Sequence, residues 1–166
     1  LDVGTSLEQT GFRGTITLRP ETLMQVVRDV AGEVESQGFS HLVILNAHGG
    51  NHCLTPVVRD INRADRDLKI LLVHFWQHCD PDIARSNGPA GPDLHAGEWE
   101  TSLMLALHPE KVGDERRDRT PEPDVEFPLR QADLTTFGFG RLNPAGSGGY
   151  PSRASREKGE AIIDSI

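Results

Sequence analysis

The stretch HLVILNAHGGN at residues 41–51 decides the fold class of this chain. Its first six residues, 41–46, form a nearly continuous apolar run bounded by polar residues, and a similar run, LKILLVHF, occupies residues 68–75. Each run predicts a buried strand of a parallel sheet that is covered on both faces. Between them, apolar side chains recur on one side of a predicted helix over about 52–65. Strand, helix and strand in this order predict a right-handed crossover and a layered α/β sheet.

The segments on either side of this stretch carry further signals of secondary structure. Residues 113–150 are rich in proline, glycine and charge and show little periodicity, so we expect a long loop that is functional or packs against a partner. Four other elements are predicted from periodicity and from boundary residues such as Pro20 and Gly38: a short strand at 14–18 and helices over about 21–37, 97–107 and 152–165, the last capped by Ser152 or Ser155.

Length, composition and charge exclude several classes of protein. The chain has 166 residues, of which 36% are hydrophobic and 25% are charged, and its net charge is −8. These values predict a single globular domain over 1–166. No apolar run reaches the ~18 residues of a membrane span, and an acidic chain without a basic run offers no footprint for nucleic acid or an anionic membrane. Two cysteines are too few for a disulfide framework, which predicts a cytoplasmic protein.

The first motif that carries chemistry is NAHGGN at residues 46–51, where the first predicted strand ends. Ligands of open α/β sheets bind beyond the carboxyl ends of the strands. His48 at this place can bind a metal or act as a general base, and the backbone of Gly49 and Gly50 can approach a ligand closely. The alternative is a plain strand-to-helix turn in which Asn51 caps the following helix.

The second motif is HAGEWETS at residues 95–102, in which His95 precedes a predicted helix with two carboxylates in its first turns. Glu98 and Glu100 are two positions apart, so they point about 200° away from each other on a helix and are expected to have different roles. One can reach a site while the other caps or pairs. The alternative is that both only interact favourably with the helix dipole.

The end of the second predicted strand adds one candidate residue. Trp76 lies at the carboxyl end of this strand and is interpreted as a pocket residue. His74 and His78 have the spacing of a helical metal pair, but they straddle a strand end, so this spacing does not put them on one face. We interpret both as structural.

Together, the two motifs in this order and about 45 residues apart resemble the creatininase family of metal-dependent amidohydrolases. The resemblance covers nearly the whole chain. It includes residues 11–16, GFRGTI, near the start, residues 103–107, LMLAL, after the second motif, and the segment from Gly149 to Gly159 near the end.

The resemblance implies a three-layer α/β/α fold with a mostly parallel sheet and hydrolysis of a small, often cyclic, amide at a non-peptide C–N bond. It also implies a site for two divalent metal ions (Zn, Mn or Fe) and a homo-oligomer, commonly a hexamer. His48 matches the metal-binding His of the first motif, and His95 matches the catalytic His that hands a proton to the leaving nitrogen. Trp76 matches a substrate-stacking aromatic residue, and Gly49 and Gly50 would line the pocket.

Two positions depart from creatininase itself. Creatininase carries a metal-binding Glu two residues after the metal-binding His, where this chain has Gly50. Glu100 is our first choice for a replacing carboxylate and Glu98 the second, with Glu98 otherwise assigned to catalysis. Creatininase also has a second tryptophan four residues before the catalytic His, where this chain has Gly91, or Pro92 if the alignment slips by one. Creatinine is therefore an unexpected substrate, and a formamide deformylase or a peptidase-like enzyme fits as well as a lactam hydrolase.

The start of the chain bears on the metal site. Leu1 opens the chain in sequence typical of a domain interior, so we expect a domain truncated at its N-terminus. The family's remaining ligands would lie in that earlier segment, and Glu8-Gln9 falls where relatives often have Glu-His. We expect residues 1–166 alone to bind at most one metal ion per chain, weakly, and to hydrolyse no substrate at a useful rate. The competing hypothesis is a non-catalytic fragment or subunit with an incomplete metal site. We further expect His48, His95 and one of the two glutamates to meet in a single cleft.

Overall fold

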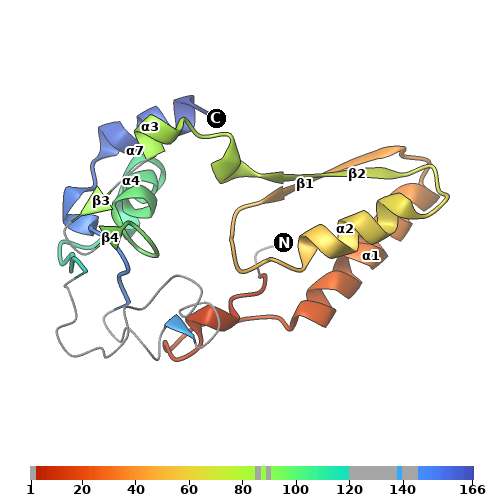
Figure 1. Cartoon of the computed structure of the whole chain (residues 1–166), viewed down its shortest axis with the longest axis horizontal. Coiled ribbons are helices and arrows are strands. Elements are labelled where there is room, and N and C mark those ends of the chain that lie inside the picture. Colours follow the sequence, from red (N-terminus) through yellow and green to blue (C-terminus); the bar gives the residue numbers. More distant parts are fainter. Residues whose placement is uncertain (1–2, 85–86, 89–90, 120–137, 140–145) are drawn as a thin grey trace. The chain divides into compact units, whose positions relative to one another are not determined.

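The computed structural model describes residues 3–84, 87–88, 91–119, 138–139 and 146–166. The chain divides into two compact units, Leu1–Gln77 and His78–Ile166, each with its own internal packing. Figure 1 shows the elements of each unit along the sequence. No helix in the described ranges combines the length and the apolar character that crossing a membrane requires. The expectation of a single domain over 1–166 stays a prediction.

The first unit contains the predicted strand–helix–strand stretch. Helix α1 (Pro20–Ser36) is followed by β1 (His41–Asn46), α2 (Leu54–Arg63) and β2 (Lys69–His74), with short 3₁₀ turns at Leu7–Gln9 and Phe75–Gln77. The two strands pair in parallel, in a register that runs from His41 opposite Lys69 to Asn46 opposite His74. These bounds confirm both predicted strands and both predicted helices of this unit, and with them the α/β fold class.

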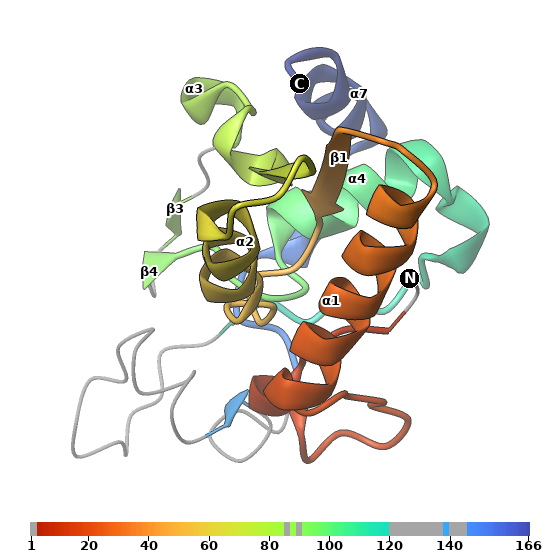
Figure 2. The same ribbon diagram turned by 90° about the vertical axis from the view of Figure 1, so that its right-hand side faces the viewer.

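The core of the first unit lies between the two helices and one face of the sheet. Helices α1 and α2 lie next to each other on the same side of the strands (Figures 1 and 2). They bury a cluster that consists of Leu23, Val27 and Ala31 from α1, Leu54, Val57, Val58 and Ile61 from α2, together with Cys53, Leu68 and Ile70.

Within the first unit, the helices cover one face of this two-stranded sheet and leave the other uncovered, so this unit by itself does not test the expectation of strands covered on both faces. Val43, Leu45 and Leu71 are 61%, 67% and 60% exposed. They alternate with the half-buried Leu42, Ile44 and Leu72 that pack on the helices. An unbroken apolar run thus gives one packed and one exposed face here, because a strand sends successive side chains to opposite faces.

Boundary residues explain why α1 begins and ends where it does. Pro20 occupies the first turn, where its missing N–H costs no hydrogen bond. Gly38 follows the helix with φ of +84°, a left-handed conformation that favours glycine. Near this end, Glu35 accepts hydrogen bonds from Arg66 and from the Leu68 N–H, and the Arg66 bond lowers the pKa of Glu35. This contact ties the end of α1 to the start of β2.

The second unit is built around two packed helices. Helix α4 (Glu98–Leu107) contacts α7 (Arg156–Asp164), and a Cβ at Gly159 would overlap the Ser102 carbonyl, so the backbones meet closely. The Ser155 side chain caps α7 by accepting the Lys158 N–H, which confirms one of the two predicted caps. The remaining elements are short: α3 (Pro81–Ala84), β3 (Asn87–Gly88) antiparallel to β4 (Gly91–Pro92), and 3₁₀ turns at Pro109–Lys111 and Pro151–Arg153.

Two other expectations concern the irregular segments. The short strand expected at 14–18 is wrong: these residues are irregular, and Leu18 reaches only the Gly4 carbonyl with its N–H. A sheet ladder needs a neighbouring strand, and none of the described residues supplies one there. Much of the long loop expected at 113–150 lies outside the described residues.

Candidate active site

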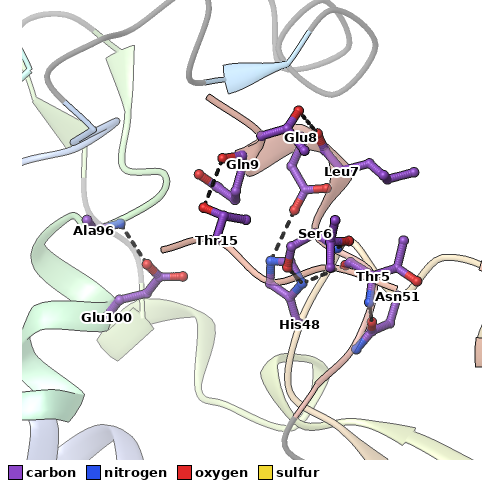
Figure 3. Close-up of polar contacts among 12 residues, drawn as sticks. Thr5, Ser6, Leu7, Glu8, Gln9, Thr15, His48, Asn51, Ala96 and Glu100 are labelled. Atoms are coloured by element: carbon purple, nitrogen blue, oxygen red, sulfur yellow. Dashed lines mark hydrogen bonds and ion pairs between the residues drawn. The ribbon is translucent and has the colours of Figure 1, made fainter. Parts of the chain in front are cut away.

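The NAHGGN motif forms the turn between β1 and α2, at the carboxyl end of β1. Asn46 is buried, and its side-chain oxygen accepts hydrogen bonds from the His48 N–H (3.3 Å) and from the Asn51 amide (3.0 Å). The Asn51 oxygen in turn accepts the Thr5 N–H at 2.7 Å (Figure 3). The two asparagines therefore hold the turn in shape and attach it to the segment around Thr5.

The orientation of His48 follows from the same segment. Its Nδ1 lies 3.2 Å from the Thr5 carbonyl oxygen and 3.4 Å from the Ser6 hydroxyl. A carbonyl can only accept, so Nδ1 carries the proton and donates it to Thr5. In the neutral ring, Nε2 then carries the free lone pair, which is the form that binds a metal or accepts a proton. The His48 side chain is one-third exposed.

Nε2 faces Glu8, a carboxylate to which the sequence assigned no role. The distance from Nε2 to Glu8 Oε1 is 3.2 Å, and the Glu8 side chain is only 9% exposed (Figure 3). Within the described part of the chain, no hydrogen-bond donor reaches Oε1. The only sequence signal was the position of Glu8 opposite the Glu-His of relatives.

Gly50 leaves the space that the Glu8 carboxylate occupies. A Cβ at this position would lie 2.7 Å from Glu8 Oε1 and 2.7 Å from His48 Cε1, and it would overlap the Thr5 carbonyl. Any side chain at position 50 would therefore displace Glu8 or His48. Gly49, by contrast, has open space around its Cα.

His48 also lies along a groove of about 610 Å³ in the first unit. The groove has mostly apolar walls, contributed by β1 and by one side of α1, and its polar lining is concentrated around the turn. The lining residues include Val26 and Val30 from α1, Ile44 from β1, and Asn46, His48 and Asn51 from the turn. The metal-ligand candidate of the first motif therefore faces a space that a small organic molecule could enter.

The second motif is positioned by Asp93 in the second unit. Its carboxylate accepts the backbone N–H groups of Glu98 (2.9 Å), Trp99 (3.0 Å) and Tyr150 (2.9 Å). The first two belong to the first turn of α4, whose N–H groups have no acceptor within the helix itself, so Asp93 acts as a remote cap of this helix. A Cβ at Gly97 would overlap the same carboxylate.

The three side chains of the second motif that could carry chemistry, those of His95, Glu98 and Glu100, have different surroundings. The His95 ring lies against Phe139, with 5.0 Å between centroids. Glu100 is exposed and accepts the N–H of Ala96, a residue with φ of +51°. Glu98 is largely buried and pairs with Lys158 of α7 at 2.6 Å. The different surroundings of the two carboxylates agree with the 200° separation expected from the sequence, but which of them binds metal stays a prediction.

The predicted site residues are distributed over both units. His48, Gly49, Gly50 and Trp76 belong to the first unit, where Trp76 follows β2 and packs on His74 at 5.1 Å between centroids. His95, Glu98 and Glu100 belong to the second unit. No group of three or more His, Cys, Asp or Glu side chains is close enough to hold a metal among the described residues. Convergence of the two motifs on one cleft therefore stays a prediction.

Comparisons with known proteins agree on one family. The family model "Creatininase: Creatinine amidohydrolase" matches residues 1–166. Creatinine amidohydrolase of Pseudomonas putida is 32% identical over 92% of this chain and 62% of its own length. The mycofactocin precursor peptide peptidase of Mycobacterium ulcerans is 31% identical over 96% of this chain and 58% of its own length. The chain thus spans about three fifths of the length of these relatives.

Solved structures with the same fold include forms described by their metals. A structure described as creatininase Mn has a TM-score of 0.66 and 28% identity. A creatininase variant of Zn-Zn type has a TM-score of 0.66 and 29% identity. Each match covers 97% of this chain and 67% of the other.

Proposed function

Because the chain belongs to the creatininase family, we propose that it acts as a metal-dependent amidohydrolase that breaks a C–N bond of a small amide. The observation that carries this proposal is the state of His48. Its Nδ1 is committed to the Thr5 carbonyl, so its Nε2 lone pair is available at the carboxyl end of β1. The manganese and zinc forms of creatininase support a divalent metal as the cofactor.

The donor set around His48 fits such a metal. An imidazole nitrogen with a carboxylate oxygen beside it is a ligand combination that suits Zn, Mn and Fe alike. In this proposal His48 is a metal ligand through Nε2, and Glu100 of the second motif adds a carboxylate, with Glu98 as the second choice. When bound, the metal supplies a Lewis acid that polarises the amide carbonyl and lowers the pKa of water.

The remaining roles fall to residues that touch the substrate. His95 donates a proton to the leaving nitrogen, a task for which an imidazole is suited near neutral pH. The backbone at Gly49 and Gly50 lines the pocket, and Trp76 stacks on the substrate. Glu98 is paired with Lys158, which favours a positioning role for it over proton transfer. We also propose that the protein works as a homo-oligomer.

The test uses the protein expressed from its whole reading frame, stripped of metal and reloaded with Zn²⁺, Mn²⁺ or Fe²⁺. It is assayed against creatinine, formamides, lactams and a short peptide, with release of ammonia or amine as the readout. We expect hydrolysis of at least one non-peptide amide only in a metal-loaded sample, and its loss in His48→Gln and in His95→Gln. A chain that holds metal but hydrolyses none of these amides would support the competing hypothesis of a non-catalytic subunit.

A further inference from the structure

We propose that Glu8 is a metal ligand that acts together with His48. This inference rests on the proposed function, since it assumes the same metal. It assigns a role to a buried carboxylate that the proposed mechanism does not use.

The first step of the argument is a conflict between two acceptors. Nδ1 of His48 donates to the Thr5 carbonyl, so Nε2 presents a lone pair. An ionised carboxylate also only accepts hydrogen bonds. Yet Nε2 and Glu8 Oε1 face each other at 3.2 Å. Two such atoms attract only when a positive species, a proton or a metal ion, lies between them.

The second step is the burial of Glu8. The side chain is 9% exposed, and Oε1 has no hydrogen-bond donor among the residues that the structure describes. A carboxylate oxygen that is buried against a neutral imidazole nitrogen and accepts no hydrogen bond is costly to bury. Gly50 supports this interpretation of Glu8, because the absence of a side chain at position 50 allows the Glu8 carboxylate to approach His48.

The third step is the distance itself. Zinc binds imidazole nitrogen and carboxylate oxygen at about 2.0–2.2 Å, so two ligands at a tetrahedral angle are about 3.4 Å apart. The observed separation of 3.2 Å is close to this value. Glu8 and His48 are thus already spaced as neighbouring ligands of one ion.

The alternative is a protonated His48 that forms an ion pair with Glu8 without any metal. The two arrangements differ in what Glu8→Gln does. If Glu8 is a ligand, the neutral amide removes an uncompensated buried charge, so the metal-free protein keeps or gains stability while metal affinity falls. If the pair is structural, the same change destabilises the metal-free protein and leaves metal affinity unchanged.

The experiment compares four forms of the 166-residue chain: the unchanged protein, Glu8→Gln, His48→Gln and the control Glu33→Gln. Glu33 is an exposed glutamate of α1 in the same unit, so its replacement removes one negative charge at a distance from His48. Each form is stripped of metal and titrated with Zn²⁺ and with Mn²⁺ by calorimetry. Thermal unfolding is measured with and without metal, because an ion that binds only the folded state raises the melting temperature.

We expect the unchanged protein and Glu33→Gln to bind one ion per chain. Glu8→Gln and His48→Gln should each bind it at least about 10- to 100-fold more weakly, since even the loss of an outer-shell partner costs that much. At the same metal concentration, metal should raise the melting temperature of Glu8→Gln by less than that of the unchanged protein. Unchanged binding in Glu8→Gln, together with lost binding in His48→Gln, would overturn the role of Glu8 and leave the proposed function intact. No binding by the unchanged protein, or unchanged binding in His48→Gln, would overturn both.

Discussion

The substitution Gly97→Ala tests how the second motif is held in place. Gly97 has φ of −90° and ψ of −159°, which alanine adopts without strain. Its only obstacle is steric, because the new Cβ would overlap the Asp93 carboxylate. That carboxylate accepts three backbone N–H groups and cannot move away without losing them. Gly97→Ala and Asp93→Ala should therefore break the same three hydrogen bonds.

The expected free energies follow from those bonds. A hydrogen bond of this kind contributes about 1 kcal/mol net, so each single variant should lose about 3 kcal/mol of unfolding free energy. Additive effects would give about 6 kcal/mol for the double variant. Once the carboxylate is gone, however, the alanine at 97 meets no obstacle from it, so the double variant should also lose only about 3 kcal/mol. The coupling between the two positions is then about 3 kcal/mol, at the upper end of measured values.

Urea unfolding followed by tryptophan fluorescence measures this coupling. The chain has two tryptophans, Trp76 and Trp99, so a Trp76→Phe background leaves Trp99 of α4 as the reporter. Gly113→Ala is the matched control, because a Cβ there meets nothing within 4 Å. The control should leave the urea midpoint unchanged. A double variant that loses the sum of the two single effects would refute the steric argument.

Four further outcomes are expected. Gly32→Ala, on the exposed side of α1 with open space around it, should stabilise the protein by about 0.5–1 kcal/mol in urea unfolding, because alanine is the better helix former. Lys158→Met should lower the unfolding free energy by about 2 kcal/mol, because it leaves the largely buried Glu98 without its lysine, and adding Glu98→Gln should restore most of the loss. Hydrogen bonds from the side chain and the backbone of Ser152 lower the pKa of Asp118. Asp118 therefore makes a small contribution to folding stability that is present at neutral pH and is lost as the pH falls through the pKa of Asp118 in the folded protein. The difference in urea midpoint between the unchanged protein and Asp118→Asn should accordingly shrink in acid, and a constant difference would contradict this. Metal-loaded protein should hydrolyse creatinine poorly or not at all in a coupled ammonia assay, because Gly91 or Pro92 stands where creatininase has its second tryptophan. Efficient turnover would contradict that reasoning.

Local patterns predicted the regular elements of this chain well. Helix α1 was predicted from its apolar period and from Pro20 and Gly38, and both observed ends lie within a turn of the predicted ones. The two parallel strands were placed from their apolar runs. These signals are encoded within a few residues, so they can be read without knowledge of the rest of the fold. Which side of a strand is covered depends on packing partners elsewhere in the chain, so the apolar run could not reveal that Val43 and Leu45 face away from the helices of their own unit.

The site was less accessible to sequence reasoning for the same reason. His48 was selected from its motif, but its tautomer depends on the carbonyl of Thr5, 43 positions earlier. Glu8 was passed over because no spacing rule connects it to a motif 40 residues further on. Asp93 lies outside both motifs and carried no signal of its own, and its role as a remote cap depends on the way the chain returns at Tyr150. Contacts of this kind arise only from the three-dimensional fold.

The open face of the β1–β2 sheet has a consequence for synthesis of the protein. Both strands lie before residue 77, so the face with Val43, Leu45 and Leu71 can form while the second unit is still being translated. At about 5–20 residues per second, the 89 residues from His78 to Ile166 take roughly 5 to 20 seconds. During this time the ribosome carries an apolar strand face that the helices of the first unit leave uncovered, and a surface of this kind binds chaperones and drives nascent chains to aggregate. The yield of soluble protein in a cell should therefore depend on chaperone supply and on the speed of translation after residue 77.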